Sequence, residues 1–459
     1  MEKDKDAIFM LASFNFNLTY KKNTHIISLK KRGIIMRLSR LNIKKINLND
    51  IDKNYSGQDI LMKLGELYQY ESGIYGYGNL WTKLERIVEN IIIEELDKVG
   101  CIQVEFPKLQ PKKIWEQSNR WDMYTKEGDI MFTLDNNLGE YGLAPTAEEC
   151  ATLFGAARLP SYKNLPAIYY QIGEKFRKEI RTRGYLFRPR TFVMMDAYSF
   201  DKTEEDMRKT YDLMHEAYLN IFKRLGIKIM PTVSDNGVIG GSVAEEFQAA
   251  TKLGEDTVLY DEEQNLGINK EVLEFDNKDD YLKQLNITDT SKLKEYQAVE
   301  LGNNFQLGTK YSESMKLFYI DENGNNKPYY MGCYGIGLGR IIACLIENNV
   351  IRKDDKIKGF ALPYEIAPYK VQIIYNENNK DKAEELYKEL TDNNINAIID
   401  DRENLTIGNR INDVYVLGTP KMIILGNKFD GKNYCIENTK DNTTDTVNVS
   451  EIVKYFKNL

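Results

Sequence analysis

Arginines gather in one stretch of the sequence, residues 175–192. Five of them fall within fourteen residues, namely Arg177, Arg181, Arg183, Arg188 and Arg190. A run of charges usually forms the solvated face of a helix, but Gly184 and Pro189 interrupt helical spacing here. Strand-like segments at 167–173 and 191–197 flank the run. An arginine-rich loop between two strands suits a polyanion such as a triphosphate, because the guanidinium fork matches phosphate oxygens.

A cluster of glycines ends at Arg340; its members are Gly332, Gly335, Gly337 and Gly339. The chain contains no P-loop pattern, and no triplet of these glycines fits GxGxxG. Glycines before an apolar helix, here expected at 341–346, commonly allow close backbone packing. A guanidinium at the mouth of such a turn can also face a phosphate or stack on a base, so Arg340 is a candidate nucleotide ligand.

A third polar segment, residues 143–149, reads Leu-Ala-Pro-Thr-Ala-Glu-Glu. The spacing of Thr146 and Glu149 is that of a helix cap. By itself this segment therefore indicates no chemistry.

The composition limits what these candidates can do. The chain has 459 residues, 42% hydrophobic and 29% charged, with a net charge of −7, as in ordinary soluble globular proteins. The length predicts two or three domains, and no apolar stretch is long enough to span a membrane. Five cysteines without a CxxC pair indicate a reducing compartment. Only two histidines, His25 and His215, are present, which argues against histidine-based zinc sites and a Ser-His-Asp triad.

Hydrophobic periodicity predicts the elements that position these side chains. We expect a helix at 84–96, a strand at 102–106 and a second helix at about 204–225. The buried stripe of the second helix is predicted to be Met207, Tyr211, Met214, Tyr218 and Phe222. Strand and helix then alternate at 371–375, 380–393, 397–400 and 421–425. This alternation predicts a small α/β domain of roughly ninety residues at the C-terminus.

Two further regions differ from the rest. Residues 1–48 carry eleven Lys and Arg residues against three acidic ones, and their acidic opening does not fit a secretory signal. We expect an extension, with Met36 as an alternative start; an organellar import signal in residues 1–35 is the other interpretation. Residues 262–295 are polar and weakly periodic, so they are expected to form an insertion or a small subdomain.

Three segments of the chain resemble, in order, the three motifs of class II aminoacyl-tRNA synthetases. They are the helix at 84–96 with Pro107, then Lys175–Glu179 with Arg188–Phe192, and finally Met331–Arg340. The phrases Trp115–Trp121 and Asp400–Arg402 are similar to segments of prolyl-tRNA synthetases of bacterial or mitochondrial type. From about Met36 to the C-terminus, the chain resembles that family, and class I signatures are absent.

The resemblance implies an α+β fold, with an antiparallel-sheet catalytic core, flanking helices and a C-terminal α/β anticodon-binding domain. It divides the chain into a basic extension (1–48), a class II catalytic domain (49–365, with 262–295 as a shortened insertion) and an anticodon-binding domain (366–459). The implied function is ATP-dependent activation of L-proline and its transfer to tRNA(Pro) by a cytoplasmic homodimer. Mg²⁺ is implied as a bridge between ATP phosphates, without a metal site made by protein ligands alone.

The resemblance also assigns an ATP site and a proline site, residue by residue. The ATP residues are Arg177, Glu179, Arg188, Phe192 and Arg340. Arg177 and Arg340 provide the catalytic charge stabilisation, because the amino-acid carboxylate itself attacks the α-phosphorus. Glu179 would accept a hydrogen bond from the adenine amino group. Phe192 would stack on one face of the adenine base and Arg340 on the other. The proline residues are Thr146, Glu148, Arg177, Phe200 and Cys333, and the implied tRNA contacts are Arg402 and Arg410.

Three positions depart from the bacterial family. Ala147, Glu245 and Asn303 stand where a histidine is usual, and all three are expected near the proline pocket. A paralogue that adenylates another amino acid or loads another acceptor is therefore an alternative. A catalytically silent tRNA-binding regulator is another, against which the intact ATP residues argue. Only about 35 residues, 262–295, stand where many members carry an editing domain, so we expect no built-in editing of alanine.

Overall fold

The computed structural model describes residues 36–459 except 55, 183, 235–242, 276–277, 285–286, 288–289 and 291–292. Residues Met36–Leu459 form one compact unit. The predicted extension up to residue 35, and Arg183 of the arginine run, lie outside the described residues. No helix in the described part of the chain is long and apolar enough to cross a membrane.

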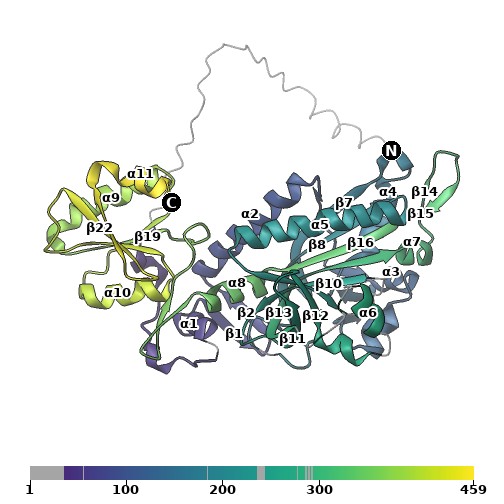
Figure 1. Ribbon diagram of the computed structural model, residues 1–459, viewed down its shortest axis with the longest axis horizontal. Helices are drawn as coiled ribbons and strands as arrows, with labels where there is room; N and C mark the ends of the chain where they lie inside the picture. The colour runs from purple at the N-terminus through teal and green to yellow at the C-terminus, as the bar shows by residue number, and fades with distance from the viewer. Residues whose placement is uncertain are drawn as a thin grey trace, which may run out of the picture. The chain divides into compact units, whose positions relative to one another are not determined.

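A nine-stranded sheet forms the centre of the catalytic region, and most of its neighbours are antiparallel (Figure 1). The strand order is β10-β9-β12-β11-β13-β16-β8-β7-β3, with parallel pairs at β12–β9 and β3–β7. The bounds are β3 (Ile102–Gln103), β7 (Ala167–Phe176), β8 (Thr191–Asp201), β9 (Ile229–Ser234), β10 (Val243–Ala250), β11 (Asp256–Asp261), β12 (Leu266–Asn269), β13 (Lys294–Gly308) and β16 (Tyr330–Gly337). The predicted antiparallel-sheet core is thus confirmed.

Three long helices cover one face of this sheet, namely α2 (Asn79–Lys98), α5 (Glu204–Arg224) and α8 (Leu338–Asn348). Helix α5 lies along β8, β13 and β16, with α2 beside it (Figure 1). The predicted stripe of α5 is buried along its whole length, which explains why this sequence forms a helix against a sheet. The Thr203 side chain accepts from the Asp206 amide and so caps the start of α5.

Shorter elements cover the opposite face and enclose a second hydrophobic core. They are α3 (Lys112–Gln117), α4 (Glu148–Arg158), α7 (Lys310–Ser314) and the small sheet β4 (Leu109–Pro111), β5 (Thr133–Asn136) and β6 (Gly139–Leu143). Because side chains alternate along a strand, β8 sends Met195 and Ala197 into the first core and Tyr198 and Phe200 into the second. The face that carries the second core also carries the site.

Peripheral hairpins and one helix complete the catalytic region. They are α1 (Ser56–Leu64), β1 (Leu67–Glu71) with β2 (Ile74–Tyr77), β14 (Phe318–Ile320) with β15 (Asn326–Pro328), and β17 (Val350–Lys353) with β18 (Lys356–Phe360). The predicted insertion 262–295 begins differently from expectation, because β12 lies between β9 and β11 in the main sheet. Helix α6 (Lys278–Gln284) follows in the same region.

The C-terminal region is an α/β domain with strand order β20-β19-β21-β22-β23. The strands are β19 (Val371–Tyr375), β20 (Ala397–Asp400), β21 (Lys421–Leu425), β22 (Asn433–Asn438) and β23 (Thr444–Asn448). Its helices are α9 (Lys380–Asp392), α10 (Ile407–Val416) and α11 (Ile452–Lys457). The three predicted strands coincide with β19, β20 and β21, which pair in parallel.

The first described residues lie against this C-terminal domain. Arg37 forms a parallel bridge with Ile399 of β20, and its guanidinium pairs with Glu384 of α9 at 2.7 Å. Ser39 donates both its amide and its hydroxyl to Asp401, and Leu38 between them is fully buried. Residues 37–39 of the predicted extension are therefore packed against the edge of the C-terminal sheet.

Candidate active site

The structure brings all five predicted ATP residues to one cavity of about 690 Å³. Arg177 and Glu179 follow β7, Arg188 precedes β8, Phe192 lies on β8, and Arg340 lies in the first turn of α8. Strands β7 and β8 pair antiparallel with Lys175 opposite Phe192, so the arginine run returns on itself beside the cavity. The predicted loop between two strands therefore places its side chains where a nucleotide could bind.

Arg340 is held by three contacts at this cavity. Its guanidinium donates to the Phe187 carbonyl oxygen at 2.8 Å and to the backbone and side-chain oxygens of Glu300 at 2.8 and 2.9 Å. Sequence reasoning missed Glu300, because a single glutamate on a strand carries no local signal. Gly335 lies opposite Asn303 in the sheet, and a Cβ there would stand 2.8 Å from the Asn303 Oδ1 atom. Gly335 thus allows close packing, and with Gly337 and Gly339 it leaves this part of the cavity wall without side chains.

The other two arginines differ in their partners. Arg188 donates to Glu179 at 2.6 Å and to Glu255 at 3.1 Å. The Arg177 guanidinium lies 5.1 Å from the Phe192 ring centroid and 3.4 Å from the Pro145 carbonyl oxygen. Because these Arg177 contacts are to neutral groups, its charge remains available to an anion.

A second cavity, of about 1280 Å³ including its open mouth, adjoins the first. Arg177, Glu179 and Arg188 line both cavities, while Tyr124 and Thr146 line only the second. Arg177 therefore stands where a nucleotide phosphate and a second substrate would meet.

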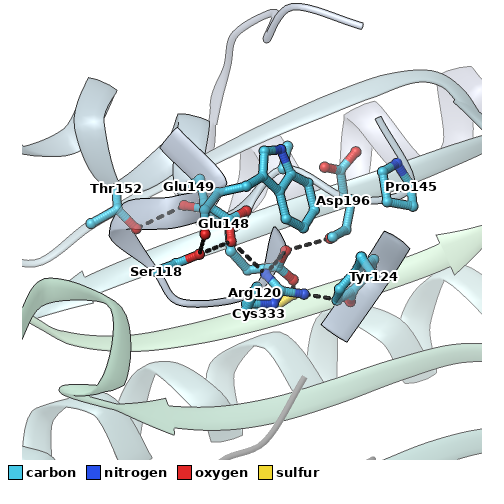
Figure 2. Close-up of polar contacts among 12 residues, drawn as sticks. Ser118, Arg120, Tyr124, Pro145, Glu148, Glu149, Thr152, Asp196 and Cys333 are labelled. Carbon is cyan, nitrogen blue, oxygen red and sulfur yellow. Dashed lines mark hydrogen bonds and ion pairs between the residues drawn. The ribbon is translucent and has the colours of Figure 1, made fainter. Parts of the chain in front are cut away.

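The predicted proline residues Thr146, Glu148 and Cys333 lie together, but only Thr146 lines the second cavity. Its hydroxyl donates to the Glu148 Oε2 atom at 2.6 Å, so the fully buried Glu148 lies behind it. The Cys333 thiol donates to the other oxygen of Glu148 at 3.4 Å (Figure 2). Burial holds the pKa of this thiol well above its ordinary value. Cys333 is thus a neutral donor that helps to orient the carboxylate.

The structure places Phe200 outside the lining of both cavities. Phe200 is fully buried and packs edge-on against Tyr169 and Tyr329 in the second core. A Cβ at Gly155 of α4 would stand 2.5 Å from its ring, so α4 approaches this ring closely. Phe200 shares a strand face with Tyr198, but it lies beyond the polar groups and lines neither cavity.

Two of the three departures from the family also lie elsewhere than expected. Asn303 lines the ATP cavity and donates to Glu300 at 2.6 Å. Glu245 accepts a hydrogen bond from the protonated His215 Nδ1 atom at 2.8 Å, where α5 packs on the sheet. Only Ala147 is next to Thr146, and its amide donates to the Tyr198 hydroxyl at 2.9 Å. The changed residues therefore do not form a common pocket.

Sequence reasoning missed Arg120, which lies within the phrase Trp115–Trp121. This arginine is fully buried and pairs with Glu148 at 3.1 Å and with Glu149 at 3.0 Å (Figure 2). A buried network on β7 and β8 was also missed. In it Asp196 accepts from Lys175 at 2.6 Å, from Gln171 at 2.9 Å and from Tyr198 at 2.8 Å. The lysine–aspartate pair is separated by twenty-one positions, and no periodic pattern marks it.

The two predicted tRNA-binding arginines both form hydrogen bonds within the C-terminal domain. Arg410 is 5% exposed, and its guanidinium donates to the carbonyl oxygens of Leu405, Tyr375 and Asp400. Arg402 is clamped by the carboxylates of Asp400 and Asp413. Arg410 has a structural role in this geometry, because burial leaves its guanidinium no face for a phosphate. A contact of Arg402 with tRNA stays a prediction.

The class II core domain of tRNA synthetases (G, H, P, S and T) matches residues 124–349, and the anticodon binding domain matches residues 370–459. The proline–tRNA ligase of Rickettsia akari (strain Hartford) is 33% identical over 435 residues, which cover 92% of this chain and 100% of that protein. The chain belongs to the proline–tRNA ligase family. The predicted family is thereby confirmed.

Further proline–tRNA ligases show the same extent of similarity. The enzyme of Ehrlichia ruminantium (strain Gardel) is 34% identical, and the match covers 85% of this chain and 92% of that protein. The enzyme of Sulfurimonas denitrificans is also 34% identical, and the match covers 92% of this chain and 99% of that protein. A crystal structure of a prolyl-tRNA synthetase from Cryptosporidium parvum, complexed with halofuginone and AMPPNP, has a TM-score of 0.69 at 17% identity. It covers 89% of this chain and 80% of that one, and it confirms the predicted fold of a class II core with an anticodon-binding domain.

Proposed function

We propose that the chain joins L-proline to ATP as prolyl-adenylate and then transfers the prolyl group to tRNA(Pro). The observation that carries this proposal is the pair of adjoining cavities with Arg177 between them. One cavity has the arginines and the aromatic face that suit ATP, and the other ends at Thr146 and the buried Glu148. Membership of the proline–tRNA ligase family supports the assignment of the second cavity to proline.

In the first step, a carboxylate oxygen of proline attacks the α-phosphorus of ATP in line. A new O–P bond forms, the bond to the bridging β-phosphate oxygen breaks, and pyrophosphate leaves. No side chain acts as nucleophile, so the enzyme contributes positioning and charge stabilisation. Arg177 would bind both the α-phosphate and the carboxylate, and Arg188 and Arg340 would bind the distal phosphates; that all three line one cavity supports these roles.

The Thr146 hydroxyl gives the second cavity its preference for a cation. Its single hydrogen is used in the bond to Glu148, so its oxygen can only accept at the cavity. Although burial raises the pKa of Glu148, the charge of Arg120 and the Thr146 bond outweigh burial and hold that pKa below its ordinary value. An anion behind an accepting hydroxyl suits the protonated secondary amine of proline.

In the second step, a terminal ribose hydroxyl of the tRNA attacks the carbonyl carbon of the adenylate. The ester forms, the bond between the carbonyl carbon and the phosphate oxygen breaks, and AMP leaves. The matched anticodon binding domain, residues 370–459, supports tRNA as the acceptor.

Mg²⁺ is proposed as a companion of ATP. No group of three or more His, Cys, Asp or Glu side chains that could hold a metal ion is found among the described residues. Protein Mg²⁺ usually takes one or two carboxylates together with phosphate oxygens and waters. Glu300 lines the ATP cavity and would be the carboxylate that holds the ion, which would neutralise developing phosphate charge.

We further propose a cytoplasmic homodimer. The hairpin β1–β2 exposes Tyr68, Tyr70 and Tyr77, and Tyr77 stacks on Trp81 of α2, in the region that resembles motif 1. Exposed aromatic clusters of this kind are typical of subunit interfaces. All five cysteines are free thiols, which is typical of a reducing compartment.

Amino-acid-dependent ATP–pyrophosphate exchange, measured with each of the twenty amino acids, tests the proposal. We expect exchange with proline and weak exchange with alanine or cysteine. Strong exchange with another amino acid alone would assign a different substrate. Exchange with none would indicate a tRNA-binding protein without catalysis.

A further inference from the structure

Arg120 occupies the centre of the polar cluster behind the second cavity, and the mechanism above gives it no role of its own. It enters from the loop after α3 and is fully buried. Its guanidinium lies 5.2 Å from the Trp115 ring centroid, 4.6 Å from that of Tyr124 and 5.2 Å from that of Tyr311. Three aromatic rings therefore hold the planar group in one orientation.

The hydrogen bonds of Arg120 lead to two hydroxyl residues that line the second cavity, directly to Tyr124 and through Glu148 to Thr146. Its Nη1 atom donates to Glu148 at 3.1 Å, and Glu148 in turn accepts from the Thr146 hydroxyl. Its Nη2 atom donates to the Tyr124 hydroxyl (Figure 2). Thr146 and Tyr124 both line the cavity. One guanidinium is thus connected to the two hydroxyls that meet a substrate.

These connections set opposite polarities at the two hydroxyls. The Thr146 hydroxyl donates its hydrogen to Glu148, so its oxygen can accept a hydrogen bond from a group in the cavity. The Tyr124 oxygen accepts from Arg120, which leaves its hydrogen for donation elsewhere. A cavity end with one acceptor and one donor suits a zwitterion, with the ammonium at Thr146 and the carboxylate towards Tyr124 and Arg177.

We propose that Arg120 is the positioning residue for amino-acid recognition, because its fork fixes the polarity of both the Thr146 and the Tyr124 hydroxyls. This inference rests on the proposed function, since it takes the amino acid to bind in the second cavity. Glu149, the other anionic partner of Arg120, has a supporting part. It accepts from Ser118 at 2.6 Å and from Arg120 at 3.0 Å, and it does not line the cavity.

The charges in the cluster are consistent with this arrangement. Burial raises the pKa of Glu149 above its ordinary value, against the pull of Arg120. The pKa of Glu148 is instead lowered, since Arg120 and Thr146 outweigh burial there. Of the two carboxylates, the one behind Thr146 is therefore the more acidic. A lysine at 120 would keep the positive charge but could not supply the planar fork.

The test is the variant R120K in the full-length chain, assayed by ATP–pyrophosphate exchange with proline. We expect the KM for proline to rise about tenfold or more, as for loss of a charge-assisted hydrogen bond, and the KM for ATP to stay within about twofold. Equal changes in the two KM values, or an unchanged KM for proline, would overturn the inference.

A second variant tests the connection through Thr146. We expect T146V to raise the KM for proline in the wild-type background. In the R120K background, we expect T146V to raise the KM for proline by less than about a further twofold, because the two residues act on one contact. Independent, multiplying effects would show that Arg120 does not act through Thr146. Failure of the wild-type chain to exchange with proline would instead reject the proposed function itself.

The matched control is S118A, which removes a buried hydrogen bond of the same cluster without touching Glu148 or Tyr124. We expect S118A to lower thermal stability and to leave both KM values within about twofold. If S118A raises the KM for proline as much as R120K does, general loosening of the cluster explains the effect and the positioning role is wrong.

Discussion

Arg177 lies at the junction of the two cavities, and its described contacts are to a carbonyl and to an aromatic face. We expect R177K to lower kcat/KM for ATP–pyrophosphate exchange by about 100-fold, because a point charge cannot serve a phosphate and a carboxylate at once. Circular dichroism of the variant checks that the fold is retained. A rate within about twofold of the wild type would remove Arg177 from the reaction.

His215 makes the stability of the protein depend on pH. The hydrogen bond to Glu245 is the main cause that raises the pKa of His215, and the nearby charges of Glu216 and Asp212 add to it against burial. A folded-state pKa above the unfolded value gives stability that is complete below pH about 6.5 and is lost as the pH rises through the raised value. We expect the wild-type melting temperature to fall more between pH 6 and pH 8.5 than that of E245Q.

The size of this effect is modest, about 0.5 to 1 kcal/mol, since the pair is partly exposed. Parallel pH curves for the wild type and E245Q would contradict the assignment. H215Q should resemble E245Q, because either substitution removes the same interaction.

At the scale of single residues, the sequence predicts those side chains whose chemistry repeats locally. The arginine run and the glycine cluster led to five side chains that the structure brings to one cavity, and their binding of ATP stays a prediction. Glu300 and Arg120 were missed, since each acts through a partner distant in sequence, Arg340 and Glu148 respectively. Arg410 was misjudged, because burial by the C-terminal sheet cannot be read from a surface-like composition.

At the scale of elements, the start of α5 offers a clean test of local structure. The Thr203 side chain accepts from the Asp206 amide at 3.1 Å. We expect T203A to reduce the free energy of unfolding by about 1 kcal/mol, measured by urea denaturation. We expect T203S to keep most of the stabilisation that the cap provides, because serine can also accept from the Asp206 amide. If T203A and T203S unfold at the same urea concentration as the wild type, packing of the buried stripe alone determines the start of this helix.

Helices and strands with a clear hydrophobic periodicity were predictable from the sequence. Which strands pair with one another in the sheet was not. The strands expected at 371–375, 397–400 and 421–425 coincide with β19, β20 and β21. The helix expected at 84–96 is longer, Asn79–Lys98, because the buried Leu80 and Trp81 continue its apolar stripe towards the N-terminus. The position of β12 between β9 and β11 follows from long-range pairing, which leaves no local signal. The same holds for the pairing of β13 with β16, which places Asn303 opposite Gly335.

At the scale of the whole molecule, the region 262–295 bears on fidelity. Its described part contains β12, α6 and the start of β13, and no separate domain is described there. A small apolar pocket discriminates weakly against a slightly smaller substrate. We expect the purified protein to form alanyl-tRNA(Pro) slowly and not to hydrolyse it when it is added preformed. Rapid deacylation by the protein alone would locate an editing activity in this chain.

The contacts of residues 37–39 limit how freely the C-terminal domain can be exchanged. Strand β20 is an edge strand, and Arg37 and Leu38 cover it through a bridge to Ile399 and pairs with Glu384 and Asp401. An uncovered edge strand is a template for association with another chain. The anticodon-binding domain therefore depends on contacts with residues outside its own segment of the chain. A chimera that takes this domain from a relative should therefore also take residues 37–39 from that relative, because these residues supply the contacts at the edge of the sheet.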